Sequence, residues 1–217
     1  MNISSQPLAP LPMALQQARA ADACRRHHIG DYEVPGEALA HFNELLTRLN
    51  FSYPCLQSDQ LASAARELVN QTCAGNTPRC IRQRLRRAAA IDLMRRDPDW
   101  GLQDGEVDRI VAGVIDYVRG NTRLIPRAAP VVARLDDAIV IEAAWPCLAT
   151  EVQQYLAFCQ LRRVEALLRG ETRQHFGFTR EQWQLAALAQ AAWIEHCLRV
   201  GGSSYLRRDA GAGFRVH

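Results

Sequence analysis

The chain contains no lysine, and all 26 of its basic residues are arginine. This absence excludes three kinds of site: a P-loop lysine on phosphate, a lysine Schiff base and a lysine general base. The positive charges are instead planar guanidinium groups, which stay ionised and suit paired contacts with carboxylates or phosphates. The formal net charge is only +3, a mild excess compared with that of a dedicated nucleic-acid-binding domain.

The motifs that mark common catalytic sites are also absent. The sequence has no GxSxG, GxGxxG, HExxH or P-loop pattern. Its seven cysteines are an odd number without a CxxC pair, which favours reduced thiols and a cytoplasmic location over a disulfide framework. Residues 1–12 have no basic start and no sustained apolar run, so we expect no secretory signal there. Nothing in the sequence points to an enzyme, and we expect no cofactor and no metal.

Long uncharged apolar runs and alternating β patterns are lacking as well. The most apolar stretch, residues 131–149, includes Arg134, Asp136, Asp137 and Glu142, which are too costly for a helix that spans a bilayer. Apolar residues nevertheless make up 48% of the chain, enough for a core. The sequence therefore predicts an all-α fold, an irregular bundle of about seven or eight helices with a proline-stiffened helical hairpin.

Changes in composition divide the chain into four expected segments. Residues 1–12 are an uncharged, disordered lead-in, and residues 13–100 form an N-terminal helical subdomain. Residues 101–200 hold the hairpin and the C-terminal helices, and residues 201–217 form a flexible tail. We expect the first helix to run from Met13 to about His28, and Trp145-Pro146 to interrupt or kink a later one.

The predicted hairpin is the most informative stretch. Its first arm begins after Asp104 and places one apolar face at helical spacing, formed by Val107, Ile110, Val111, Val114, Ile115 and Val118. Gly120-Asn121 predicts a left-handed helix end. Pro126 and Pro130 forbid helix in the connection because each lacks an amide donor. Helix resumes near Leu135, with Asp136 and Asp137 in its first turn.

This connection resembles the core signature of the YkvA-like bacterial domain. The matching residues are Leu124-Ile125-Pro126, then Pro130-Val131, then Leu135-Asp136-Asp137-Ala138, aligned without a gap over roughly residues 107–144. The resemblance implies two helices joined by a proline-containing segment in a bacterial protein. Because that family has no settled biochemical activity, the resemblance implies a fold and a biological setting more than a function.

The chain departs from the family pattern at four positions. Asn121 replaces the first proline, Arg123 and Arg127 replace acids, and Ala133 replaces a glycine. The acidic cluster of the family is thereby reduced to Asp136 and Asp137.

Asp136 and Asp137 are the first candidate site, together with Arg123 and Arg134. Neighbouring helix residues point about 100° apart, so the two carboxylates do not share one ligand unaided. One of them would accept an arginine fork from a partner or help to hold a divalent cation. In the alternative interpretation, one caps the helix and the other pairs with an internal arginine such as Arg123 or Arg134.

The arginine-rich helix 79–96 is the second candidate. Arg79, Arg82 and Arg86 fall at i, i+3 and i+7 on one stripe, with Arg87 beside it. Such a stripe suits phosphate contacts. However, no aromatic residue is interleaved for base stacking. The alternative is a solvated or internally paired face.

Three smaller features complete the candidates. Cys24, His27 and His28 have metal-ligand spacing on a helix, but no fourth ligand is near. His175, His196 and Cys197 offer a cysteine–histidine pair, although Cys197 continues an apolar stripe that predicts a core position. Trp193 lies off that stripe, and an exposed tryptophan would mark a protein contact.

The sequence favours a non-catalytic bacterial helical protein that acts by binding another protein, in a regulatory, adaptor or neutralising role. The first alternative is nucleic-acid binding through helix 79–96. The second is peripheral membrane association of the hairpin.

Overall fold

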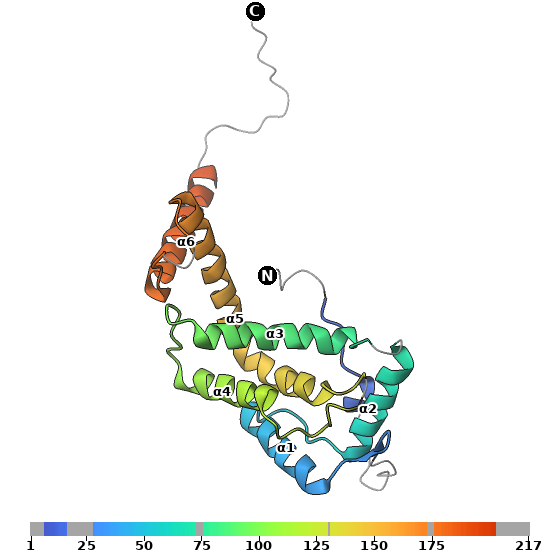
Figure 1. Cartoon of the computed structure of the whole chain (residues 1–217). Coiled ribbons are helices and arrows are strands. Elements are labelled where there is room, and N and C mark those ends of the chain that lie inside the picture. The colour runs from blue at the N-terminus through green and yellow to red at the C-terminus, as the bar shows by residue number, and fades with distance from the viewer. Residues whose placement is uncertain (1–6, 17–27, 73–75, 130, 173–175, 203–217) are drawn as a thin grey trace, which may run out of the picture. The chain divides into compact units, whose positions relative to one another are not determined.

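The computed structural model describes residues 7–16, 28–72, 76–129, 131–172 and 176–202. Within these ranges the chain is mostly helical, as expected (Figure 1). The elements, in order, are η1 (Met13–Leu15), β1 (His28–Ile29), β2 (Tyr32–Glu33), α1 (Gly36–Leu49), α2 (Ser58–Gln71), α3 (Arg79–Arg96), α4 (Gly105–Arg119), α5 (Leu135–Leu168) and α6 (Arg180–Gly202).

The described ranges hold six α-helices, so the prediction of seven or eight is wrong. One difference lies at Pro146, where we expect an interruption or a kink: the interruption is absent, since the 34-residue α5 continues through Pro146. The tertiary packing of the buried first half of α5 overrides the local preference of proline, whose cost is one missing backbone hydrogen bond.

The other difference lies at the predicted helix from Met13 to His28. Of this stretch the structure describes residues 13–16 and His28: Met13–Leu15 form the short 3₁₀ helix η1, and His28 is in a strand. Residues 17–27 lie outside the described part. His28 pairs with Glu33 and Ile29 with Tyr32, which leaves Gly30 and Asp31 as a two-residue hairpin turn. Gly30 has φ +61°, a conformation that glycine adopts without strain.

The chain divides into two compact units, Met1–Ala157 and Phe158–His217. A subdomain boundary near Trp100 stays a prediction. Two contacts join residues on either side of that position: the Trp100 indole donates to Glu151 over 3.0 Å, and the Arg84 guanidinium donates to Glu142 over 2.9 Å. Both tie the N-terminal helices to α5.

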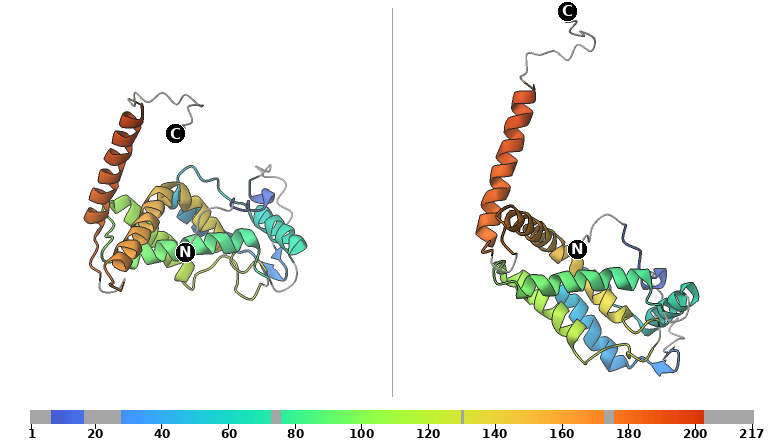
Figure 2. Two further views of the ribbon diagram at one scale, coloured as in Figure 1. Left: turned by 90° about the horizontal axis from the view of Figure 1, so that it is seen from above. Right: turned by 45° about the horizontal axis from the view of Figure 1, so that its top comes forward.

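The core of the first unit surrounds the first half of α5. Within this unit α1, α4 and α3 lie side by side (Figures 1 and 2). Ile139, Val140 and Ile141 have no exposed surface, because all faces of α5 are covered here. A helix that is apolar on every face is typical of a central helix. The side chain of Asn50 adds a hydrogen bond to the Ala143 carbonyl at 3.2 Å.

Helix α4 follows its sequence pattern closely. Ile110, Val111, Val114 and Ile115 are buried as predicted. Asp104 caps the first turn by accepting from the Glu106 amide at 2.7 Å. The left-handed end predicted at Gly120 is wrong, since its φ is −62°. Glycine fits there because a Cβ atom would lie 2.5 Å from the Asp116 carbonyl oxygen.

The second unit contains the end of α5 and helix α6. Phe158 of α5 stacks on Phe178 with ring centroids 5.6 Å apart, and Phe176 stacks on Phe178 at 5.8 Å. Thr179 and Gln182 then form a reciprocal capping box: the Thr179 amide donates to the Gln182 side chain at 3.0 Å, and the Gln182 amide to Thr179 Oγ1 at 3.5 Å. The predicted start of this last helix is therefore confirmed.

Candidate functional site

Asp136 lies at the N-terminal end of α5 and holds the connection that precedes the helix. Its Oδ2 accepts from the Tyr117 hydroxyl at 2.9 Å and from the amides of Leu124 and Ile125 at 3.2 Å each. Its Oδ1 accepts from the Asp137 amide at 2.9 Å. The Asp136 carboxylate thus holds the Leu124-Ile125-Pro126 segment, which lies in the connection after α4, against the start of α5.

Asp137 is occupied by the two arginines that the sequence brings near it. Its Oδ2 accepts from Arg123 at 2.8 Å and from Arg134 at 2.7 Å. Arg123 also donates to the Val118 carbonyl at 2.7 Å. Burial lowers the pKa of Arg123, but its hydrogen bond and attraction to Asp137 outweigh this and raise it. The guanidinium therefore stays charged, and it offsets the buried carboxylate.

Neither aspartate reaches the surface, since both have 0% exposure. Burial raises the pKa of Asp136 above its ordinary value, the charge of Asp137 adds to this, and the hydrogen bonds of Ile125 and Tyr117 oppose it. The structure brings Asp136, Asp137, Arg123 and Arg134 together, but as an internal network. Three of their four oxygens accept from donors of the same chain, and Asp137 Oδ1 is buried without a hydrogen-bond partner among the described residues. Direct contact of these aspartates with a partner stays a prediction, and their burial does not favour it.

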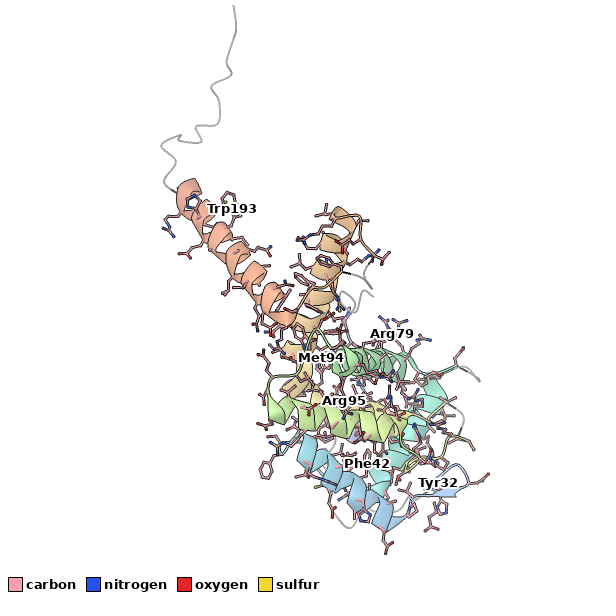
Figure 3. The ribbon with its side chains drawn as sticks, turned by 60° about the vertical axis from the view of Figure 1, so that its left-hand side comes forward. Tyr32, Phe42, Arg79, Met94, Arg95 and Trp193 are labelled. Atoms are coloured by element: carbon pink, nitrogen blue, oxygen red, sulfur yellow. The ribbon has the colours of Figure 1, made fainter. Side chains whose placement is uncertain are left out.

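The arginines of α3 separate into two groups. Arg79, Arg82 and Arg86 are exposed on one face (Arg79 in Figure 3). Arg87 points elsewhere, with its guanidinium 3.7 Å from the centroid of the Trp145 ring and 3.9 Å from Glu142. Burial lowers the pKa of Arg87. Of the four arginines predicted for nucleic acid, three share a face and the fourth belongs to the packing of α5.

Two of these exposed arginines have no acidic partner. Among the residues that the structure describes, Arg82 and Arg86 make no ion pair. Further along α3, Arg95 lies 3.7 Å from Asp116 and Arg119 of α4 donates to Asp92 at 2.6 Å. The arginines of α3 that pair with acidic residues of the same chain thus lie near its C-terminal end or on the side that faces α5.

The second unit exposes large apolar side chains along α6, and this set is the candidate functional site. Trp193 is 65% exposed and stacks on His196 at 5.9 Å (Figure 3). We define the α6 apolar surface as the exposed residues Leu185, Leu188, Trp193, Ile194 and Leu198. In the same unit, Leu167 and Leu168 of α5 are also exposed. At about 100° per residue the α6 side chains lie on more than one face of the helix, with Leu185 and Leu188 on one face and Ile194 and Leu198 on another. Exposed apolar side chains of this size mark surfaces that another molecule covers.

The core position predicted for Cys197 is wrong, because its side chain is exposed. Cys147 is likewise exposed, and Cys80 is buried. In the described part of the chain, no group of histidine, cysteine, aspartate and glutamate side chains is arranged to hold a metal ion. Cys24, His27 and His175 lie outside that part, and the exposed His28 sits in β1, not on a helix.

An open groove of about 1150 Å³ lies in the first unit between the β-hairpin, α2 and residues 126–132. Ile29, Ala65 and Val132 give it an apolar floor, and Asp31 and Arg66 give it opposite charges. A lining with both apolar residues and opposite charges does not indicate one class of ligand, so we assign no function to this groove.

Comparisons with protein-family models, with curated proteins and with solved structures give no match for the chain. None of the helices in the described ranges is long and apolar enough to cross a membrane. The functional assignment therefore depends on the side-chain geometry described above.

Proposed function

We propose that this chain is a non-catalytic bacterial protein that binds another protein through the α6 apolar surface. The observation that carries the proposal is the exposure of that surface: Leu188 is 68% exposed and Leu198 is 72% exposed on one ordered helix. Aliphatic and aromatic side chains of this size, buried together, are the usual centre of a protein interface. A regulatory, adaptor or neutralising role in the cytoplasm belongs to the same proposal.

The resemblance to YkvA-like domains is a further part of the proposal. Its support is that the residues of the signature contact one another, since Asp136 accepts from Leu124 and Ile125. In this interpretation the signature residues maintain the hairpin, and binding occurs elsewhere on the chain.

Capture from host lysate tests the proposal, using the tagged full chain and nuclease-treated extract. Two variants add a pair of negative charges to the surface, Leu185→Glu/Leu188→Glu and Ile194→Glu/Leu198→Glu. A third, Gln153→Glu/Gln160→Glu, adds the same charge at exposed positions of α5. We expect the wild type and the α5 variant to retain the same proteins and at least one α6 variant to lose them. Equal retention by all four chains would refute the proposal.

A second candidate, nucleic-acid binding, draws on the exposed and unpaired Arg82 and Arg86. Phosphate contacts through such residues lose affinity steeply as salt increases. Replacement of both by alanine would abolish retention on DNA or RNA if this function holds. Unchanged retention, or no retention by the wild type at low salt, would remove the candidate.

A third candidate, peripheral membrane association, has less support. Its charged hairpin residues Asp136 and Asp137 are buried, and α6 carries Glu181 and Glu195 beside Arg199 instead of a basic face. Flotation with anionic liposomes tests it directly.

A further inference from the structure

One face of α6 carries a heptad-spaced stripe, which we call the α6 seam. Its residues are Glu181, Leu185, Leu188, Ala192, Glu195 and Arg199, separated by steps of four, three, four, three and four. This spacing keeps the side chains on one narrow strip of a helix, as in the contact line of a coiled coil. All six side chains are exposed. Leu185, Leu188 and Ala192 in the middle of the seam are apolar, and the other three residues, toward its ends, are charged. The seam therefore has heptad spacing with a short apolar centre, and its side chains are available to pair.

The seam is complementary to itself when the second helix runs in the opposite direction. Glu181 and Arg199 are each nine residues from Gln190, and Leu188 and Ala192 are each two residues from it. Two antiparallel copies that cross at Gln190 place Glu181 opposite Arg199 of the other copy. They also place the large Leu188 opposite the small Ala192, which allows the side chains to interdigitate.

Charge selects the antiparallel orientation. A parallel pair would set Glu181 against Glu181 and Arg199 against Arg199, and like charges face to face are destabilising. The remaining layer places Leu185 opposite Glu195, whose carboxylate is already 3.3 Å from Arg199 of its own helix. Glu181 is ionised at neutral pH like any exposed glutamate, and a hydrogen bond from Thr179 lowers its pKa further.

We infer that the partner of the α6 seam is a second copy of this chain, bound as an antiparallel, two-fold symmetric helix pair centred on Gln190. The inference rests on the proposed function and names the partner of the part of the α6 apolar surface that Leu185 and Leu188 form. The alanines at 189 and 191 flank the centre and permit close approach of the two helices. A seam of this length is short compared with a permanent interface, so the dimer is reversible and its population increases with concentration.

Charge reversal at the two ends of the seam tests the inference. In Glu181→Arg, both end layers of the dimer become Arg–Arg, and in Arg199→Glu both become Glu–Glu. In a mixture of the two variants, however, each layer is again Arg–Glu. Sedimentation equilibrium of the full chain should show that each single variant dimerises roughly tenfold or more weakly than the wild type. The equimolar mixture should recover most of that loss.

Two further variants separate the seam from the rest of α6. Leu188→Glu should abolish the dimer, while Ile194→Glu, on another face, should leave it intact. Gln190→Glu and Gln190→Arg, which point away from the seam, control for added charge in the middle of α6. Far-UV circular dichroism verifies that each variant is folded, which is expected because all the substituted side chains are exposed.

A wild-type chain that stays monomeric at the highest accessible concentration overturns the inference. So does a dimer that withstands both single reversals, or a mixture that does no better than its components. In any of these cases, a different protein retained by the wild type and lost from Leu188→Glu leaves the proposed function standing. A dimer that is unchanged in Leu188→Glu removes the inference. The proposed function is removed only if Leu185→Glu/Leu188→Glu and Ile194→Glu/Leu198→Glu also retain the same proteins as the wild type.

Discussion

Asp136→Asn is predicted to destabilise the fold by about 3 kcal/mol, because the buried carboxylate accepts four hydrogen bonds. An asparagine retains one oxygen. If this oxygen takes the place of Oδ2, its amide nitrogen meets the Asp137 amide, so that two donors face each other. In the opposite orientation, the nitrogen meets the Tyr117 hydroxyl and the amides of Leu124 and Ile125.

The magnitude follows from the better of these two orientations. One bond from a buried amide to a charged oxygen is lost, and three others lose their charged acceptor. Bonds to charged groups contribute about 1.5–3 kcal/mol each, and a buried donor without a partner costs about 1–3 kcal/mol. Removal of a buried charge beside Asp137 offsets part of this loss, which leaves about 3 kcal/mol.

Urea unfolding at neutral pH, followed by circular dichroism, measures this change. The matched control is Asp116→Asn on α4, whose side chain is 77% exposed and lies 3.7 Å from Arg95. We expect the control to stay within about 0.5 kcal/mol of the wild type, since exposed ion pairs contribute little. An Asp136→Asn chain that is as stable as the control would refute the structural role of Asp136.

Three other predictions concern the rest of the fold. Burial, with the charge of Glu142, raises the pKa of Tyr53 from 10.0 to about 12, so the folded chain retains a proton that the unfolded chain loses. Its stabilising contribution is complete below pH 10 and falls as pH increases. By pH 11 the free energy of unfolding should have fallen by about 1.4 kcal/mol on this account. Urea titrations of Tyr53→Phe should lack this part of the pH dependence. Arg84→Met removes a 1% exposed guanidinium that donates to Glu142, and it should lower the free energy of unfolding by about 3 kcal/mol in the same assay. The double variant Arg84→Met/Glu142→Met should regain part of that stability, because it leaves no unpaired carboxylate. Thr179→Ala removes the capping box with Gln182 and should lower the local stability of the first turn of α6 by about 1 kcal/mol. Amide hydrogen exchange in that turn should become correspondingly faster. Unchanged exchange there, or an unchanged pH slope in Tyr53→Phe, would contradict these assignments.

Features that depend on near neighbours in sequence could be predicted. The buried face of α4, the Asp104 cap and the Thr179–Gln182 box follow from spacing and side-chain chemistry alone. The internal pairing of Asp137 with Arg123 or Arg134 was one of two interpretations of the same residues. Sequence alone did not decide between them, because burial depends on which helices cover the start of α5.

Features set by tertiary packing could not be predicted. The sequence leaves an interruption and a kink open at Pro146, and the continuation of α5 through it depends on the packing around that helix. The bonds from Leu124 and Ile125 to Asp136 join backbone and side chain across the connection, which no periodicity reveals. The β-hairpin did have a signal, the Gly30-Asp31 pair between Ile29 and Tyr32, but the run of residues before it favoured helix.

The exposure of α6 illustrates a general limit of periodicity. Ile194, Cys197 and Leu198 recur at helical spacing and predict a buried face, yet all three are exposed. Apolar spacing identifies a face that needs to be covered, but it does not say whether the same chain or another molecule covers it. For α6 we propose another protein molecule.

Site-specific photo-crosslinking from α6 tests that claim most directly. A photoreactive phenylalanine analogue replaces Leu188 in the full chain expressed in its host, and the same analogue at the exposed Gln153 of α5 is the control. We expect a protein adduct from position 188 that is absent from position 153. If the partner is a second copy, the adduct has twice the 24.3 kDa mass of the chain. Absence of any protein adduct at 188, or equal adducts at both positions, would contradict the assignment of α6 as a protein-binding surface.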